Sequence, residues 1–319
     1  MINPYQYVQD EPYKLYINGE FVPSASGETV EAINPVNNQP FATMYKGGKE
    51  DVQRAIAAAR DAFDNGPWGK MSNLRRSKLL LRFRDLLMER QEEFACLETL
   101  DCGKLYPSAL YYELPQAIDA FEYYAGKARS LEGHVVPVDG GGQYLNYVTW
   151  DPCGVVGEIL PWNGPLMMGC QKIAAILAAG NTVVVKPSSW ASLSLLQLAT
   201  VFHEAGFPPG VVNIITGSGA LVGDMLVRSK DVDMVSLTGG TETGKQIIAA
   251  SADTIKHLAL ELGGKSPNII FEDVDIENAA KWALWGFTLN SGQVCGSLCK
   301  SPFMKSFWRR SASSARVLS

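Results

Sequence analysis

Cys295 has the clearest nucleophilic setting in this chain. It follows Gly292-Gln293-Val294, and a thiol after a flexible turn at the end of a helix can attack an electrophilic carbon once it is deprotonated. The alternative is an inert core thiol, because free cysteines are commonly buried and unreactive. The pattern predicts a candidate nucleophile and leaves both interpretations open.

Glu261 is the candidate base. It stands between Leu260 and Leu262 and is followed by the pair Gly263-Gly264. We expect a carboxylate between apolar residues to lose part of its hydration, which makes it a better proton acceptor near neutral pH. A glutamate paired with a neighbouring lysine or arginine is the other interpretation.

Two polar side chains follow expected strands. Asn163, in Pro161-Trp162-Asn163, lies where a strand turns into a helix, so its amide N–H can donate to a developing oxyanion. A turn or helix-capping residue is the alternative. Lys186 ends the next expected strand, where it either bonds ribose hydroxyls or remains a solvated charge.

The glycine-rich run from Gly239 to Lys245 follows an expected strand and opens a helix. Backbone N–H groups and the helix dipole can receive a phosphate in such a turn. A Walker A loop requires Ser or Thr after the lysine, and this chain has Gln246. A nucleotide triphosphatase is therefore disfavoured, and a glycine turn without a ligand is the alternative.

These residues belong to a βα repeat over residues 154–271. The expected strands are 154–160, 182–186, 211–216, 232–237 and 256–260, and the helices between them begin near 166, 192, 220 and 242. Continuous apolar strands separated by helices predict an α/β fold with a doubly wound, Rossmann-like parallel sheet. Such sheets bind ligands outside the carboxyl ends of their strands.

Other elements flank this repeat. Glycines and prolines break residues 14–43 into short strands and turns, and helices are expected over 50–65, 73–100 and 114–131. A further helix after Asp275 leads to Cys295. The last twenty residues are rich in serine, contain no Asp or Glu and show no periodicity.

The composition favours a small-molecule enzyme. The net charge is −5 and the pI is about 5.4, which argues against nucleic acid and anionic membranes as partners. Six scattered cysteines without a CxxC pair indicate neither a disulfide framework nor a metal site. Without a leader pattern or a long apolar run, we expect a cytoplasmic protein with reduced thiols.

Five motifs taken in order resemble the aldehyde dehydrogenase superfamily. They are PWN at 161–163, KPS at 186–188, GGTETG at 239–244, LELGGKSPN at 260–268 and GQVC at 292–295. The spacing between Glu261 and Cys295 is also similar to the spacing between the family's base and its nucleophile. The combination is far more specific than any one motif.

The resemblance implies a role for four residues. Cys295 would attack an aldehyde to form a thiohemiacetal, whose oxyanion the Asn163 amide and the Cys295 backbone N–H would hold. Glu261 would then activate water to hydrolyse the resulting thioester to a carboxylic acid. Lys172 matches a family lysine proposed to help relay the proton.

The resemblance also implies a nicotinamide cofactor, with NAD as the first choice. Where the family often carries a glutamate that repels a 2′-phosphate, this chain has Ser189, so NADP stays possible. The expected cofactor-binding residues are Ile159, Pro161, Trp162, Asn163, Lys186, Ser188, Ser189, Gly219, Gly223, Thr238, Gly239, Gly240, Thr241, Thr243, Leu262 and Gly263.

The resemblance covers residues 14–295, whereas family members continue with the rest of a catalytic domain. We therefore expect an NAD(P)-binding domain over 1–261, the beginning of a second α/β catalytic domain over 262–295 and a disordered tail over 296–319. A hairpin around 134–151 is expected to serve oligomerisation, since the family forms homo-oligomers. A catalytically inactive nucleotide-binding or subunit-interaction protein is the alternative to a truncated aldehyde dehydrogenase.

Overall fold

The computed structural model describes residues 2–140 and 142–296. The chain divides into two compact units, Met1–Glu261 and Leu262–Ser319. Apart from Gly296, the expected disordered tail lies outside the described residues. Among the described residues, no helix combines the length and apolar content needed to cross a membrane.

A seven-stranded sheet forms the centre of the fold. β7 pairs in parallel with β8 on one side and with β10 on the other, and β8 pairs in parallel with β9. Every residue of β7 and β8 is buried, since strands pair along both of their edges and helices pack on this part of the sheet. The predicted α/β fold is confirmed, with strand order β11-β10-β7-β8-β9-β1-β2 and strands β7 (Val155–Ile159), β8 (Thr182–Lys186), β9 (Val212–Ile214), β10 (Met234–Gly239) and β11 (His257–Leu262).

The sheet is not purely parallel, which differs from the expected parallel sheet. β1 (Leu15–Ile17) pairs antiparallel with β9 and with β2 (Glu20–Val22). All three residues of β1 are buried. The two N-terminal strands thus cover what would otherwise be an open hydrogen-bonding edge at β9.

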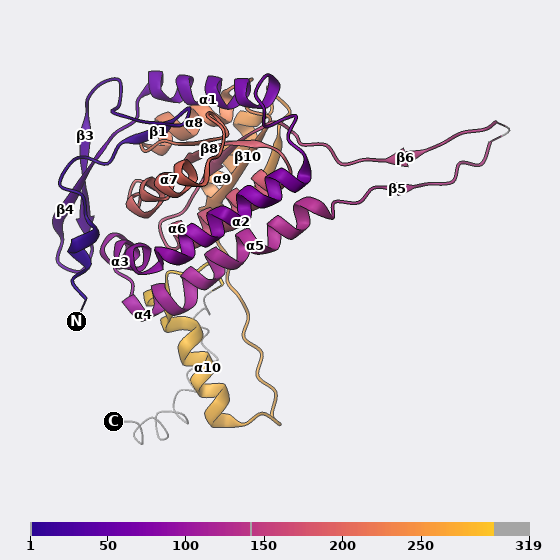
Figure 1. Ribbon diagram of the computed structural model, residues 1–319. Coiled ribbons are helices and arrows are strands. Elements are labelled where there is room, and N and C mark those ends of the chain that lie inside the picture. The colour runs from indigo at the N-terminus through magenta and orange to yellow at the C-terminus, as the bar shows by residue number, and fades with distance from the viewer. Residues whose placement is uncertain (1, 141, 297–319) are drawn as a thin grey trace. The chain divides into compact units, whose positions relative to one another are not determined.

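Helices cover both faces of this sheet (Figure 1). On one face α1 packs against β7, β8 and β9, and α8 packs on α1. On the other face α6 packs on β8 and α7 on β9, with α2 and α5 outside them. The helices are α1 (Lys49–Asp64), α2 (Asn73–Glu89), α5 (Leu114–Arg129), α6 (Pro165–Ala178), α7 (Leu193–Ala205), α8 (Asp224–Arg228) and α9 (Thr241–Ser251).

An aromatic cluster joins the outer helices α2 and α5 to α7, which packs on the sheet. The rings of Phe83 and Phe121 stack with their centroids 3.9 Å apart, and Phe202 lies 4.3 Å from Phe83. All three side chains are fully buried. Because they come from α2, α5 and α7, the cluster fixes the N-terminal helices against the βα repeat.

The helix expected over 73–100 is two helices. α2 ends at Glu89 and α3 (Gln91–Cys102) follows, with Arg90 between them in a non-helical conformation (φ −106°, ψ 14°). The Arg90 guanidinium donates to Glu93 and to Thr200 on α7. These hydrogen bonds stabilise the non-helical conformation of Arg90. Helical periodicity could not predict them, because Thr200 is distant in sequence.

The expected hairpin is present as an arm. β5 (His134–Val135) and β6 (Tyr147–Val148) pair antiparallel, and the arm projects away from the sheet and helices of the first unit (Figure 1). Its exposed apolar side chains include Tyr144, Leu145 and Trp150. The other short elements of this unit are η1 (Pro4–Tyr7), β3 (Thr29–Asn34), β4 (Gln39–Tyr45), α4 (Tyr106–Ser108), η2 (Ala109–Glu113) and η3 (Gly219–Gly223).

The second unit contains the helix expected after Asp275. This helix is α10 (Ile276–Thr288), followed by η4 (Leu289–Gly292). The Asp275 carboxylate accepts the Asn278 N–H at 2.7 Å, which caps the helix N-terminus.

Candidate active site

The carboxyl ends of β7 and β8 bring three expected cofactor-binding residues together. Ile159 pairs with Lys186 in the strand register, and the Leu160 N–H donates to the Lys186 carbonyl at 3.0 Å. A Cβ added to Gly223 would lie 3.8 Å from Ile159 Cδ1 and 3.9 Å from Lys186 Cδ. Gly223 therefore lies beside both residues, and a Cβ there would touch each of them at an ordinary van der Waals distance.

Lys186 is buried at this edge, with 4% of its surface exposed. Its Nζ donates to the Pro187 carbonyl at 2.8 Å. Burial lowers the pKa of Lys186 to about 8. The solvated charge that the sequence left open is therefore wrong, and the ammonium is a partly dehydrated donor at the sheet edge.

The glycine turn after β10 has the features of an anion site. Gly240 is the N-cap of α9, and this glycine provides no capping side chain for the N–H groups of the first turn. Around Gly240 there is open space where a Cβ would stand. Thr238 Oγ1 is buried without a hydrogen-bond partner among the described residues. Thr241 and Thr243, in the first turn of α9, are exposed.

Asn163 is half-buried in the turn between β7 and α6. Gly164 is the N-cap residue of α6, and Asn163 is the turn residue directly before it. Pro161 beside it is buried and Trp162 is 44% exposed. The turn thus sets an amide side chain at the carboxyl edge of the central strand.

The expected adenosine side of the site has internal hydrogen bonds. Ser188 Oγ accepts the Trp190 N–H at 3.2 Å, and Ser189 Oγ donates to the Gly217 carbonyl at 3.0 Å. Gly217 lies just before η3, the turn that carries Gly219 and Gly223. The Ser189 hydroxyl therefore links the end of β8 to this glycine turn.

Glu261 is exposed, so the expectation of a partly desolvated carboxylate is wrong for this structure. β11 is an edge strand with a neighbour, β10, on one side only. The alternating pattern of leucines around Glu261 could not show that the strand lies at the edge. No ion pair of Glu261 is present among the described residues.

Cys295 lies in the second unit as an exposed free thiol. The inert core cysteine that the sequence left open is therefore wrong for Cys295, whereas Cys96 and Cys170 are buried. A Cβ added to Gly264 would lie 3.8 Å from the Cys295 carbonyl oxygen. Within the second unit, the thiol segment thus lies beside the expected Leu262-Gly263-Gly264 run, in which Leu262 is half-buried and Gly263 is exposed.

Lys172 has two partners that sequence reasoning missed. Its Nζ donates to Ser236 Oγ at 2.7 Å and lies 3.7 Å from Glu158 Oε1. Glu158 is fully buried in the middle of β7. The sequence did contain one sign of this contact, because Glu158 is a single carboxylate inside the apolar run from Val155 to Ile159.

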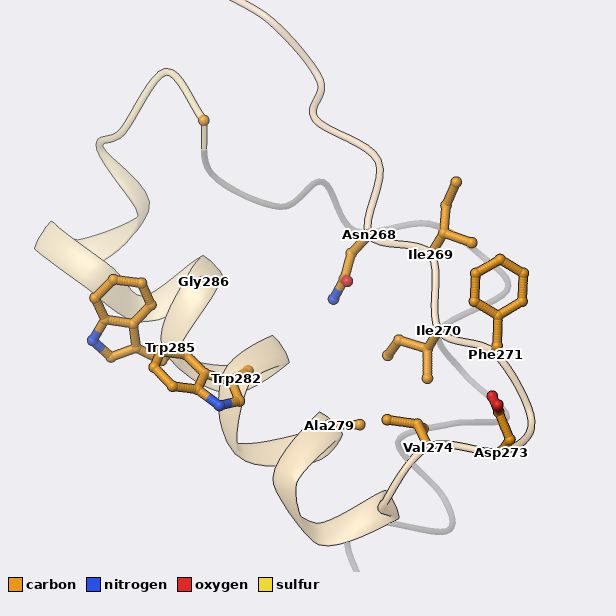
Figure 2. A pocket seen from close by; sticks show the side chains of 11 residues that line it. Asn268, Ile269, Ile270, Phe271, Asp273, Val274, Ala279, Trp282, Trp285 and Gly286 are labelled. Carbon is orange, nitrogen blue, oxygen red and sulfur yellow. The ribbon is translucent and has the colours of Figure 1, made fainter.

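A hollow with a volume of 550 Å³ lies within the second unit. Trp282 and Trp285 of α10 line it together with residues of the segment from Asn268 to Val274 (Figure 2). The two indole rings lie 5.7 Å apart, edge to face. None of the expected catalytic residues lines this hollow, which is an open apolar face of the second unit.

Comparisons with known proteins give a family for this chain. The aldehyde dehydrogenase family model matches residues 21–312. Aldehyde dehydrogenase family 2 member B4 of Arabidopsis thaliana is 45% identical over 296 residues, which cover 92% of this chain and 54% of that protein. Aldehyde dehydrogenase [NAD(P)+] 2 of Saccharomyces cerevisiae is 43% identical over 287 residues, covering 89% and 56%.

The fold gives the same result. An NAD+ complex of an aldehyde dehydrogenase from Bacillus cereus superposes with a TM-score of 0.92 at 41% identity and covers 99% of this chain and 65% of that chain. The chain spans about half the length of the curated relatives that it matches. Because the family model, the sequences and the fold agree over most of the residues, the chain belongs to the aldehyde dehydrogenase family.

Proposed function

We propose that this protein oxidises an aldehyde to a carboxylic acid with NAD(P)+, using Cys295 as its nucleophile. Family membership supports the reaction class. The observation that carries the proposal is that Gly223, which has no side chain, lies beside Ile159 and Lys186 at the carboxyl edge of the sheet. Ligands of doubly wound sheets bind at this edge.

The residues present fit a dinucleotide. Thr238 Oγ1 is a buried hydroxyl without a partner among the described residues, and the first turn of α9 offers N–H groups without a capping side chain. These groups and Gly240 would hold the pyrophosphate, and Lys186 would hold the adenosine ribose. A dinucleotide held by these residues would supply the oxidant of the reaction, a nicotinamide ring able to accept hydride.

NAD is the proposed cofactor, and NADP stays possible because Ser189 carries no charge against a 2′-phosphate. An aldehyde dehydrogenase from Bacillus cereus was solved as an NAD+ complex, and a yeast relative bears NAD(P)+ in its name. The Ser189 hydroxyl donates to Gly217, so it occupies the position without repelling a phosphate.

Four residues of the chain have separate roles in the proposed reaction. The Cys295 thiolate attacks the aldehyde carbon, and the Asn163 amide with the Cys295 backbone N–H holds the oxyanion of the thiohemiacetal. After oxidation to the thioester, Glu261 takes a proton from water, which attacks the acyl carbon and releases the acid and the thiol. Lys172 helps to carry that proton away.

A large side chain at position 223 is expected to weaken cofactor binding. In Gly223→Leu, the new side chain would press on Ile159 and Lys186, two of the expected cofactor-binding residues, so Kd for NAD+ should rise about tenfold or more, which is roughly 1.4 kcal/mol. Isothermal titration calorimetry measures this effect without requiring turnover. Gly126→Leu is the matched control, because nothing lies within 4 Å of a Cβ at Gly126, and equal Kd values for both variants would contradict the site.

The first test of the proposed function is NAD(P)H production at 340 nm with one short aliphatic and one aromatic aldehyde. Saturable turnover that Cys295→Ser abolishes is the expected result. A protein that binds NAD+ without any turnover would overturn the proposed activity.

An inactive nucleotide-binding or subunit-interaction protein is the second candidate. The exposure of both Glu261 and Cys295 favours it, because an acyl transfer site usually excludes bulk water from its reacting groups. The 340 nm assay separates the two candidates, since only the enzyme turns over.

The arm supports a proposal of homo-oligomers. Leu145 and Trp150 are 76% and 62% exposed on it, and exposed apolar side chains gathered on a projecting element are typical of subunit contacts. Leu145→Asp with Trp150→Asp should shift the mass measured by light scattering toward the monomer. Trp190→Asp, which changes a residue that is 82% exposed outside the arm, is the control; an unchanged mass in the arm variant would refute this contact.

The cytoplasm is the proposed compartment. The five cysteines that lie in the described part of the chain are free thiols, which fits a reducing environment. One of the relatives bears a mitochondrial location in its name. Separating the cytosol and organelles of the source cells and immunoblotting the fractions would test the compartment, and recovery in an organelle fraction alone would overturn it.

A further inference from the structure

Glu158 is a carboxyl group in a position built for apolar side chains. It lies on the central strand β7 with paired strands on both sides, and none of its side chain is exposed. Moving a carboxylate ion from water into such an interior costs roughly several kcal/mol, even after the protein relaxes around it. Burial raises the pKa of Glu158 to about 8, against the opposing influence of Lys172 and Ser236.

Three elements converge on this carboxyl group. Lys172 comes from α6, and Ser236 comes from β10, where it is the register neighbour of Glu158. The Lys172 Nζ donates to Ser236 Oγ at 2.7 Å but stays 3.7 Å from Glu158 Oε1. Within the described residues, neither oxygen of Glu158 has a hydrogen-bond partner. The group is therefore near the ammonium without being tied to it by a hydrogen bond.

The location connects this group to the candidate active site. Glu158 precedes Ile159, the last residue of β7, and Lys172 lies within α6, so the turn that carries Asn163 connects the two elements that hold these residues. Ile159 itself lies beside Gly223 and pairs with Lys186. A change of charge on Glu158 thus acts on Lys172, the proposed proton carrier, from the strand that leads into this turn.

We propose that Glu158, with Ser236, is a positioning residue that holds the Lys172 ammonium in place and controls the release of the proton during thioester hydrolysis. This inference rests on the proposed function. A protonated Glu158 leaves Lys172 with its Ser236 hydrogen bond alone, whereas the carboxylate adds an ion pair that draws the ammonium toward β7. Lys172 from α6 is the charged group that faces Glu158, and Ser236 from β10 is the polar one.

The first experiment follows the protonation of Glu158 itself and needs no turnover. In infrared spectra of the full chain, the band of a protonated buried carboxyl should disappear with an inflection near pH 8, as the raised pKa of about 8 implies. Glu158→Gln should remove this band. Ser236→Ala and Lys172→Met should each move the inflection upward, by about one pH unit or more for the lysine. Glu204→Gln, an exposed glutamate of α7, is the matched control.

The second experiment measures stability against pH. A free glutamate titrates near about 4.3, so the folded protein holds an extra proton on Glu158 between that pH and about 8. The native chain should therefore lose stability as the pH rises through this window, and Glu158→Gln should not. The Tm advantage of the variant should be absent near pH 4 and largest above pH 8.

The third experiment measures how the rate of thioester hydrolysis depends on pH. The rate of thioester hydrolysis in the native chain should change with an inflection near pH 8 that Glu158→Gln removes, whereas a purely structural role would alter Tm and leave the pH profile unchanged. If the native chain shows no turnover, the proposed function fails while the infrared titration still decides whether Lys172 and Glu158 are coupled. An inflection that Lys172→Met and Ser236→Ala leave unmoved, or a pH profile that Glu158→Gln leaves unmoved, overturns the inference.

Discussion

Asn163→Ala is expected to lower kcat for aldehyde oxidation by about 10²- to 10³-fold, the loss measured when one side-chain donor is removed from an oxyanion site. The amide is half-buried in the turn after the central strand, so no side chain of the variant could replace its N–H. The donor acts on a charge that is absent from the free aldehyde. The loss should therefore fall on kcat, with little change in Kd for NAD+.

Steady-state rates at 340 nm and calorimetric titration with NAD+ together test this prediction. Asn65→Ala is the matched control, because Asn65 is an exposed asparagine whose amide donates to Asp61 at 2.9 Å in the last turn of α1. A variant Asn163→Ala that loses cofactor affinity as much as kcat would show that the side chain binds the dinucleotide instead of the oxyanion. An unchanged kcat would remove Asn163 from the mechanism.

Lys104→Met is expected to destabilise the first unit by about 3–5 kcal/mol, because it leaves buried carboxylates without their counter-charge. The Lys104 Nζ lies 2.7 Å from Glu98 Oε2 and 2.5 Å from Glu113 Oε2, and its side chain is 2% exposed. Burial acts to lower the pKa of Lys104, but Glu98 and Glu113 hold it above its ordinary value. The lysine is therefore charged at every pH of interest.

The ion pairs of Lys104 also connect elements that are distant in sequence. Ser194 Oγ of α7 donates to Glu98 Oε1 at 2.5 Å, so the loss of Lys104 disturbs the contact between the N-terminal helices and the βα repeat. Urea unfolding followed by circular dichroism measures the change. Lys245→Met breaks a pair with Glu242 of nearly the same length, 2.7 Å, but with side chains 65% and 80% exposed. This control should cost about 0–1 kcal/mol, and equal losses for the two variants would contradict the prediction.

Much of the fold followed from local patterns. The strands from Val155 to Leu262 and the helices between them lie close to where apolar runs and glycine turns predicted them, because a buried parallel strand and its crossover helix each need a continuous or periodic set of apolar residues. The motif order also led to the family. The βα elements and the motifs can each be recognised from short stretches of residues.

Contacts between distant segments decided the remainder. β1 completes the sheet at β9, and Arg90 breaks a helix by reaching Thr200. Neither contact leaves a periodic trace in the sequence.

The charged residues of the candidate site also show what the sequence determined and what the tertiary structure decided. The sequence by itself determined the residue types Cys295, Glu261, Asn163 and Lys172, but their surroundings depend on which strand lies at an edge and which lies in the middle. Glu261 on the edge strand is exposed, whereas Glu158 on the central strand is fully buried beside Lys172. The tertiary structure alone decided this, because the hydration of a carboxylate is set by neighbours that the chain supplies from other strands and helices.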